Sequence, residues 1–288
     1  MKCIGSNAFE RTQKTDVKSG FPELDKITNG WSNGNLIIVA SRPAMGKTAF
    51  GMSLLREIAV KNRIPTAFFS LEMSNQQAIN RFQGTLSRVD TMRIIDYDNG
   101  NQNALDENEK NRLADAEKQI DIAPIYLDNT PALSLSELWQ KSVRLISDFQ
   151  IKLIIIDYLQ LMSAQGLLFS NRTEEVTNIV RNLKTLAKTL NIPVIAFSQL
   201  NRGVESRESF DGIRPKLSDL RESQAIEQDA DVVCFIHCPE YYGIYLDADG
   251  NDLHGLAEII VAKNRNGKTG DLRLKFNGEC ASFSNLNE

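Results

Sequence analysis

The sequence predicts an α/β fold, in which a mostly parallel central sheet is flanked by helices and a C-terminal antiparallel hairpin follows. Short apolar runs rich in β-forming residues alternate with helical patterns along most of the chain. Runs this continuously apolar are typical of strands that are covered on both faces, as in a parallel sheet between layers of helices. Six runs are predicted to be strands, at residues 36–40, 66–70, 125–127, 153–156, 194–198 and 232–236.

Capping patterns and apolar periodicity predict helices between these strands. Ser74 with Gln77, and Ser134 with Glu137, have the spacing of capping boxes, which mark the start of a helix. Residues 173–190 carry an apolar stripe at helical spacing, which we expect to face the core. The stripe consists of Val176, Ile179, Val180, Leu183, Leu186, Ala187 and Leu190.

Residues 257–278 have the pattern of two strands joined by a turn rich in Asn and Gly. This pattern predicts an antiparallel hairpin, which we expect at an edge of the sheet. Residues 1–15 are polar and unpatterned, and we expect them to be a flexible tail or the remnant of a linker. The remaining residues, 16–288, are expected to form one domain.

The composition is that of a soluble globular protein, with 42% hydrophobic and 24% charged residues. No apolar run is long enough to span a bilayer or to form a signal peptide, so we expect a cytoplasmic protein without a membrane partner. The net charge of −4 excludes an overall basic field, and any DNA contact must come from local loops. The four cysteines are scattered, and Cys234 and Cys238 are expected to be free thiols rather than zinc ligands.

A phosphate-binding loop is predicted directly after the first strand. Residues 41–48 have the sequence SRPAMGKT, which matches G-x-x-x-x-G-K-[ST] except that Ser41 replaces the first glycine. Such a loop points backbone N–H groups at phosphate oxygens, at the positive end of the following helix. Lys47 is expected to reach the β- and γ-phosphates of ATP or another NTP, and Thr48 to bind Mg²⁺. The predicted nucleotide-binding residues of this segment are Ser41, Arg42, Pro43, Ala44, Met45, Gly46, Lys47, Thr48 and Ala49.

Three further strands end in polar residues, and ligands of open α/β sheets bind beyond the carboxyl ends of the strands. Asp157 follows four apolar residues and has the form of a carboxylate that holds Mg²⁺ together with the loop hydroxyl. Glu72 could orient and polarise an attacking water, or could be a helix-terminal carboxylate before Ser74. Gln199 carries an amide that could sense the γ-phosphate, or could be a solvated amide of a loop.

Seven motifs occur in the order SRPAMGKT, FFSLEMS, IIIDYLQLM, FSQLNR, LSDLRES, IEQDAD and AKNRNG. With these motifs the chain resembles, from about Asp16 to the C-terminus, the ATPase domain of the DnaB-type replicative DNA helicases. The resemblance implies a RecA-like P-loop fold and an ATP-dependent DNA helicase. It also implies a homo-oligomer, a hexameric ring that hydrolyses NTP at subunit interfaces while it moves along single-stranded DNA.

The resemblance implies roles for individual residues. The family's catalytic base corresponds to Glu72, its Walker B aspartate to Asp157 and its γ-phosphate sensor to Gln199. Arg81, nine residues beyond Glu72, corresponds to an arginine that packs on the nucleotide base. Lys263 and Arg265 match the family's K-x-R step, which reaches into the site of the neighbouring subunit.

The family's R-E-S-G stretch, which contacts the DNA backbone, corresponds to Arg221, Glu222 and Gln224. Gln224 stands where the family has glycine, and this difference could alter a contact made by a backbone amide. Further basic residues add positive charge nearby in the sequence, namely Arg172, Arg181, Lys184, Lys188, Arg202, Arg207, Arg214 and Lys216.

In the family, a helical N-terminal domain forms a collar and meets primase, and that domain is missing from residues 1–288. We therefore expect either an excised ATPase domain or a naturally short relative, with primase and a helicase loader as further partners. Two other interpretations remain open at this point: a RecA-like ATPase of the recombinase or clock-protein type, and a non-catalytic nucleotide-binding assembly module.

Overall fold

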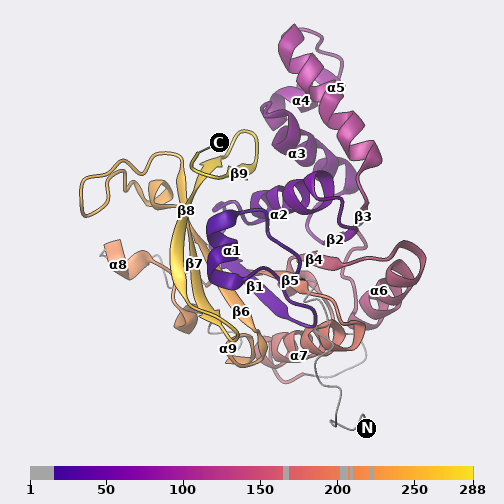
Figure 1. The fold of residues 1–288 in the computed structure, drawn as a ribbon, viewed down its shortest axis with the longest axis vertical. Helices are drawn as coiled ribbons and strands as arrows, with labels where there is room; N and C mark the ends of the chain where they lie inside the picture. The colour runs from indigo at the N-terminus through magenta and orange to yellow at the C-terminus, as the bar shows by residue number, and fades with distance from the viewer. Residues whose placement is uncertain (1–15, 165–168, 202–206, 208–209, 221–223, 288) are drawn as a thin grey trace, which may run out of the picture.

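The computed structural model describes residues 16–164, 169–201, 207, 210–220 and 224–287 (Figure 1). Within these residues one nine-stranded sheet has the order β3-β2-β4-β5-β1-β6-β7-β8-β9. The strands are β1 Leu36–Ser41, β2 Thr66–Ser70, β3 Ile125–Asp128, β4 Leu153–Asp157, β5 Val194–Gln199, β6 Val232–His237, β7 Leu256–Asn264, β8 Gly270–Asn277 and β9 Ser282–Ser284. The six predicted strands are confirmed as β1 to β6, and all of them run parallel.

Helices cover both faces of the sheet. The α-helices are α1 Pro22–Thr28, α2 Lys47–Leu55, α3 Asn75–Ser87, α4 Thr91–Asp98, α5 Glu107–Ile122, α6 Leu135–Phe149, α7 Arg172–Leu190, α8 Phe210–Ile213 and α9 Gln224–Asp229. A π-helical stretch, Arg56–Lys61, continues α2. Among the described helices, none combines the length and the apolar character needed to cross a membrane.

The hairpin prediction is confirmed in its direction and wrong in its position. β7 and β8 pair antiparallel, but β7 also pairs with β6 and β8 also pairs with β9. β7 is therefore an inner strand of the sheet, and its Ala257, Ile259 and Val261 side chains are buried in the core on one face. The edges of the sheet are therefore β3 and the three-residue strand β9, which is too short to give a sequence pattern.

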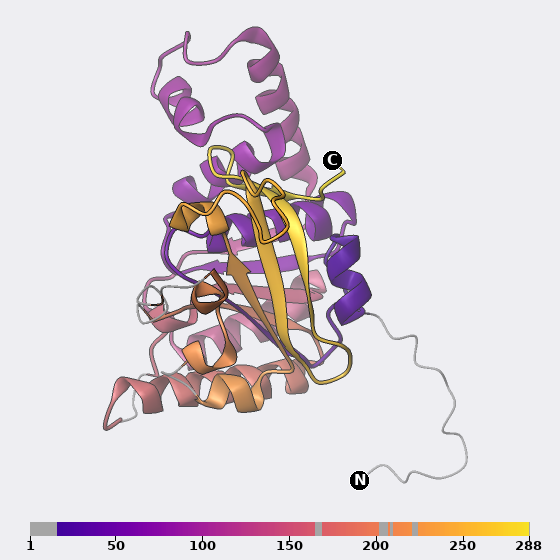
Figure 2. The same ribbon diagram turned by 90° about the vertical axis from the view of Figure 1, so that its left-hand side faces the viewer.

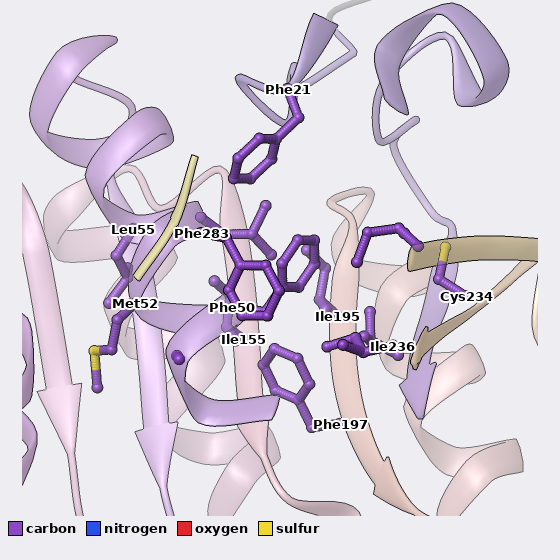
Figure 3. Packing of buried hydrophobic residues seen from close by; sticks show 14 of the residues in the cluster. Phe21, Phe50, Met52, Leu55, Ile155, Ile195, Phe197, Cys234, Ile236 and Phe283 are labelled. Carbon is purple, nitrogen blue, oxygen red and sulfur yellow. The ribbon is translucent and has the colours of Figure 1, made fainter. Parts of the chain in front are cut away.

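Alternation along each strand divides the core into two clusters, one on each face of the sheet. In β1, Ile37 and Val39 face the cluster that contains α1 and α2, whereas Leu36, Ile38 and Ala40 face the one that contains α6, α7 and α9. The first cluster is rich in aromatic rings that contact one another (Figure 3). There the Phe50 ring lies 5.6 Å from Phe21 and 5.4 Å from Phe283 between ring centroids. Strand β9 thereby closes the core over α2.

The predicted helix starts and the apolar stripe are confirmed. Both capping boxes are formed, at Ser74 with Gln77 and at Ser134 with Glu137. In α7 six residues of the stripe are buried, and Leu190 is partly buried against the same cluster. Cys234 and Cys238 are buried, which raises the pKa of both thiols to about 12 and keeps them protonated at neutral pH.

Helices α3, α4 and α5 extend beyond the layered body, at the top of both views (Figures 1 and 2). A small apolar cluster of Val89, Ile94, Leu105 and Leu113 packs α4 against α5. The Arg93 guanidinium also forms a bidentate ion pair with Glu109, in which Nη1 lies 2.5 Å from Oε1 and Nη2 lies 2.6 Å from Oε2. The Thr91 amide donates to the Glu279 carbonyl, which places the start of α4 beside the β8–β9 turn, where it becomes part of a pocket wall.

The position of Phe283 gives a stability prediction. Because its ring is fully buried between Phe50 and Phe276, Phe283→Ala should lower the free energy of unfolding by about 3–5 kcal/mol. Phe149→Ala is the matched control, and since its ring is 45% exposed the loss should be about 1 kcal/mol. Denaturant titration measures both variants. Equal losses would mean that β9 does not close the core.

Candidate nucleotide-binding site

A pocket of about 950 Å³ opens at the carboxyl edge of the parallel strands. The ends of β1, β2, β4 and β5, which are consecutive in the sheet order, lie at this edge. Polar residues that are far apart in the sequence meet there because parallel strands all end at the same edge. The residues that line it include Lys47, Thr48, Glu72, Arg81 and Gln199. A volume of this size is typical of a small-molecule site.

The loop between β1 and α2 has the backbone that a phosphate cradle requires. Ala44 and Gly46 both adopt left-handed conformations, with φ of 63° and 77°. A Cβ on Gly46 would lie only 2.7 Å from the Phe276 ring, so glycine is required at this position. Ser41 instead is the last residue of β1 and pairs with Gln199 and Ile236. A side chain fits in this extended strand, which explains why serine can replace the first glycine of the pattern.

The other predicted loop residues divide into pocket and core. Pro43, Ala44 and Ala49 line the pocket. Arg42 also lines it, although its Nη1 donates to the Leu200 carbonyl oxygen at 2.7 Å. The Met45 side chain is fully buried in the apolar core, so only its backbone can face a ligand.

Lys47, Thr48 and Asp157 form a buried charged cluster at the bottom of the pocket. Thr48 Oγ1 donates to Asp157 Oδ2 at 2.6 Å, and Lys47 Nζ lies 3.8 Å from Asp157 Oδ1. The Lys47 ammonium also lies 3.6 Å from the centroid of the Tyr158 ring. Burial raises the pKa of the Asp157 carboxyl and lowers the pKa of Lys47, while the attraction between the two groups opposes both shifts.

The donor set of this cluster fits a hard divalent cation. Asp157 Oδ1 is fully buried and accepts no hydrogen bond from any residue that the structure describes. A carboxylate oxygen and a threonine hydroxyl are ligands of the type that Mg²⁺ prefers. Thr48 and Asp157, the predicted Mg²⁺ ligands, are therefore adjacent and suitably placed to hold such an ion.

Glu72, Gln199 and Arg81 surround the same pocket from three elements. Glu72 lies in the bend between β2 and α3, and its charge influences the pKa of both Lys47 and Asp157. Gln199 ends β5, next to Ser41 in the sheet. Arg81 is an exposed residue of α3. The structure thus brings together the predicted residues that come from the strand ends.

Several residues of this site were not singled out in the sequence. Gln160 donates from Nε2 to Ser198 Oγ at 3.0 Å and accepts the Gln199 amide at 3.2 Å, so it links the ends of β4 and β5. Gln160 belongs to the DYLQLM motif, and its place in that motif could have indicated a role at this site. The outer wall comes from α4 and the β8–β9 turn, with Asp90, Thr91, Met92, Ile95, Phe276, Gly278, Glu279 and Ala281. Only long-range contacts, such as the Thr91 amide to the Glu279 carbonyl at 3.1 Å, bring these residues there.

Lys263 and Arg265 do not join this pocket. Because β7 runs antiparallel to β6, its last residues lie beside the first residues of β6, and Asn264 is opposite Val232. Val232 in turn is aligned with Ile37 near the start of β1. Both basic residues therefore lie at the amino edge of the sheet, opposite to the edge that carries the phosphate loop.

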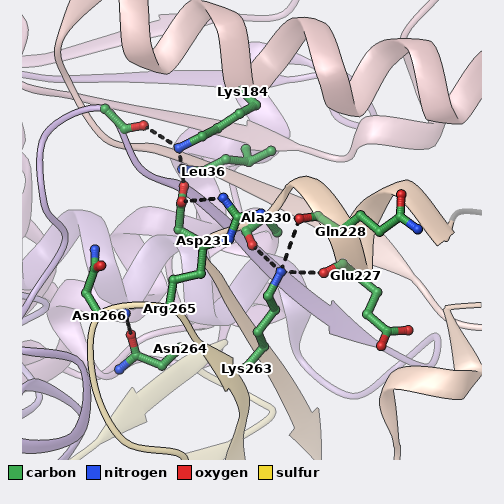
Figure 4. Close-up of polar contacts among 11 residues, drawn as sticks. Leu36, Lys184, Glu227, Gln228, Ala230, Asp231, Lys263, Asn264, Arg265 and Asn266 are labelled. Atoms are coloured by element: carbon green, nitrogen blue, oxygen red, sulfur yellow. Dashed lines mark hydrogen bonds and ion pairs between the residues drawn. The ribbon is translucent and has the colours of Figure 1, made fainter.

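At this amino edge the two side chains contact the end of α9 (Figure 4). Lys263 Nζ donates to the carbonyl oxygens of Glu227, Gln228 and Ala230, the last at 2.7 Å. Arg265 donates to the Gln228 carbonyl oxygen and lies 3.5 Å from Asp231 Oδ1. Burial and the neighbouring Arg265 charge lower the pKa of Lys263.

Of the three predicted DNA-binding residues, the structure describes only Gln224. Arg221 and Glu222 lie outside the described residues, and Gln224 is the first residue of α9. Several of the nearby basic side chains are held in ion pairs within the chain, which reduces the charge that they can offer to DNA. These pairs are Arg172 with Glu175, Arg181 with Asp229, Lys184 with Asp231, Arg207 with Asp219, and Arg214 with both Glu258 and Asp271.

Comparison with known proteins agrees with this geometry. The family model of the DnaB-like helicase C-terminal domain matches residues 16–285. The replicative DNA helicase DnaB of Geobacillus stearothermophilus is 40% identical over 94% of this chain and 57% of its own length. The Haemophilus influenzae DnaB is 43% identical over 95% of this chain and 56% of its own length. The chain thus spans a little over half the length of these relatives.

Two solved structures have the same fold. A DnaB-like replicative helicase, described with its interactions with primase, aligns over 95% of this chain and 62% of its own, with 33% identity and a TM-score of 0.84. The second structure is of an ATPase domain, and it gives the same identity and TM-score over 95% of this chain and 92% of its own. The expected α/β fold and the expected resemblance are confirmed, and this chain belongs to the DnaB-like helicase C-terminal domain family.

Proposed function

We propose that residues 16–288 are the motor domain of an ATP-dependent replicative DNA helicase, which works as a hexameric ring on single-stranded DNA. The observation that carries the proposal is the separation of the phosphate-binding pocket from Arg265 across the sheet. Each chain has a cluster for phosphate and metal at one edge and an exposed guanidinium at the other. A complete site would therefore need two copies.

The pocket residues support hydrolysis of a nucleoside triphosphate. Lys47 would bind the β- and γ-phosphate oxygens, and the amides of the loop would bind the rest of the phosphate chain. Thr48 and Asp157 would hold Mg²⁺, which would neutralise phosphate charge. Glu72 would take a proton from the attacking water, and Gln199 would contact the γ-phosphate. Arg81, on the pocket wall, would pack on the base.

A head-to-tail arrangement of copies would complete this site. If the amino edge of one copy faces the carboxyl edge of the next, each pocket receives an Arg265 from its neighbour. Such an interface is heterologous, and it produces a closed ring when the rotation between copies closes. A planar guanidinium neutralises charge spread over the transferring phosphoryl oxygens, a contribution of ~10³ to 10⁵ in rate. Lys263 lies beside Arg265 and would assist it.

Single-stranded DNA is the proposed track of the motor. Arg221, Glu222 and Gln224 would contact its backbone, and they directly precede or begin α9, which the K-x-R residues hold at its other end. Because one relative of this fold is described with primase, we propose primase and a helicase loader as partners of the assembled protein, in the cytoplasm. Family membership favours this function over a recombinase or clock-type ATPase.

Removal of the Lys47 charge should abolish ATP hydrolysis. We expect Lys47→Ala to lower kcat for ATP hydrolysis by at least ~10²-fold, because the phosphates lose their ammonium partner. Lys26→Ala is the control, since Lys26 is an exposed residue of α1 far from the pocket lining and should retain wild-type turnover. Steady-state hydrolysis measures both. Wild-type turnover by Lys47→Ala would contradict the proposal that this loop binds the phosphates of the substrate.

Mixing two inactive variants should restore activity. Lys47→Ala lacks a working pocket but keeps Arg265, whereas Arg265→Ala has an intact pocket and lacks the guanidinium. In co-assembled equal amounts, roughly a quarter of the head-to-tail interfaces would combine an intact pocket with an intact Arg265. Hydrolysis should rise toward that fraction of the wild-type rate. If the mixture remains as inactive as its components, Arg265 does not act between copies.

A further inference from the structure

We propose that Asp231 is a positioning residue, which holds Arg265 in place for use by the neighbouring copy. This inference rests on the proposed function, in which Arg265 acts in the pocket of a neighbouring copy. It assigns no role to Asp231 in the pocket of its own chain. Asp231 lies between α9 and β6, at the same amino edge of the sheet as Arg265. Its carboxylate connects three elements that meet at this edge (Figure 4).

The Asp231 carboxylate is fixed in orientation by contacts to one of its oxygens. Oδ2 accepts the Leu36 amide of β1 at 2.8 Å and the Lys184 ammonium of α7 at 2.5 Å. The backbone is fixed too, because the Asp231 amide donates to the Leu36 carbonyl at 2.9 Å. Asp231 is also buried, so it has little freedom to turn. Oδ1 is therefore presented in one direction only.

That direction is toward Arg265. Oδ1 lies 3.5 Å from Arg265 Nη1, and the Arg265 amide donates to the Asp231 carbonyl at 2.9 Å. Arg265 Nη2 bonds to the Gln228 carbonyl on the other side. The Arg265 side chain nevertheless remains 45% exposed. A long side chain is thus held at its base and at its guanidinium while it stays accessible to a second copy.

This arrangement reduces the number of conformations that Arg265 must lose when it enters a neighbouring site. Arginine has a large rotamer entropy, and a preorganised side chain loses less of it on binding. Removal of the Asp231 charge should leave Arg265 mobile and misplaced. A displacement of about 1 Å in a catalytic group can lower the rate ~10²-fold.

A structural role for Asp231 is the competing explanation, because Lys184 also bonds to the Gly34 carbonyl at 2.9 Å and so anchors α7. Loss of the Asp231 charge would then simply lower the stability of the whole fold. The two explanations differ in which copy must carry the intact Asp231. A positioning role matters only in the copy that donates Arg265, whereas a loss of folding lowers activity equally whichever copy carries the substitution.

The mixed assemblies described above separate these explanations. We would place Asp231→Asn either in the Lys47→Ala copy, which donates Arg265, or in the Arg265→Ala copy, which supplies the pocket. The restored kcat should fall about 10- to 100-fold in the first mixture and stay within about twofold in the second, with KM for ATP unchanged in both. The folding cost of the substitution is the same in the two mixtures and cannot produce this asymmetry.

Equal loss in both mixtures would overturn the positioning role and leave a structural one, and no loss in either would overturn it as well. If the parent mixture without Asp231→Asn regains no activity, the proposed role of Arg265 fails first, and the inference fails with it. In a homogeneous assembly, Asp231→Asn added to Arg265→Ala should cause no further loss of kcat. A further loss would show that Asp231 acts independently of Arg265.

A second variant covers the case in which Asp231→Asn does not fold. Lys184→Met removes the ammonium that orients the Asp231 carboxylate, and it should lower the restored kcat only when it is in the Lys47→Ala copy. Lys118→Met, an exposed lysine of α5 that has no assigned role, is the control and should have no effect in either copy. An effect of Lys184→Met in both copies would contradict the positioning role.

Discussion

The parallel direction of β2, β4, β5 and β1 is the constraint on which the site depends. Since these four strands are neighbours and point the same way, the residues that follow them are delivered to one edge of the sheet. The phosphate loop, Glu72 and Gln199 line the pocket there, and Asp157 is bonded to Thr48 beneath it, although these residues span more than half of the chain. The buried Thr48–Asp157 hydrogen bond then joins the start of α2, which follows β1, to the end of β4. The cluster is prearranged by the fold itself.

The reversal of direction after β6 has the opposite consequence for Arg265. An antiparallel strand that starts at the carboxyl edge must end at the amino edge, so β7 carries the K-x-R residues away from the pocket of its own chain. A chain with complementary groups at opposite edges is suited to head-to-tail assembly and poorly suited to act alone. The contacts of Asp231 and Lys263 keep the basic residues at that edge in an ordered arrangement.

The parts of the fold and site that could be predicted from the sequence were those with a local signal. Buried strands were recognised by their apolar runs, α7 by its stripe, and the starts of α3 and α6 by their capping boxes. The phosphate loop and the strand-end residues were recognised by residue type and spacing. The rest depends on contacts between distant segments. Strand β9 was missed because three residues carry no period, although Phe283 is central to the core. Asp231 lies in the motif IEQDAD, but its link to Arg265 arises only when β6 and β7 pair.

The central claim is that the site is shared between copies and serves a motor on DNA. The most direct test is the rate of ATP hydrolysis over a series of protein concentrations, with and without single-stranded DNA, and with Lys47→Ala as the blank. Turnover per chain should rise with protein concentration and rise further with DNA. Constant turnover per chain from a demonstrated monomer, indifferent to DNA, would contradict the account.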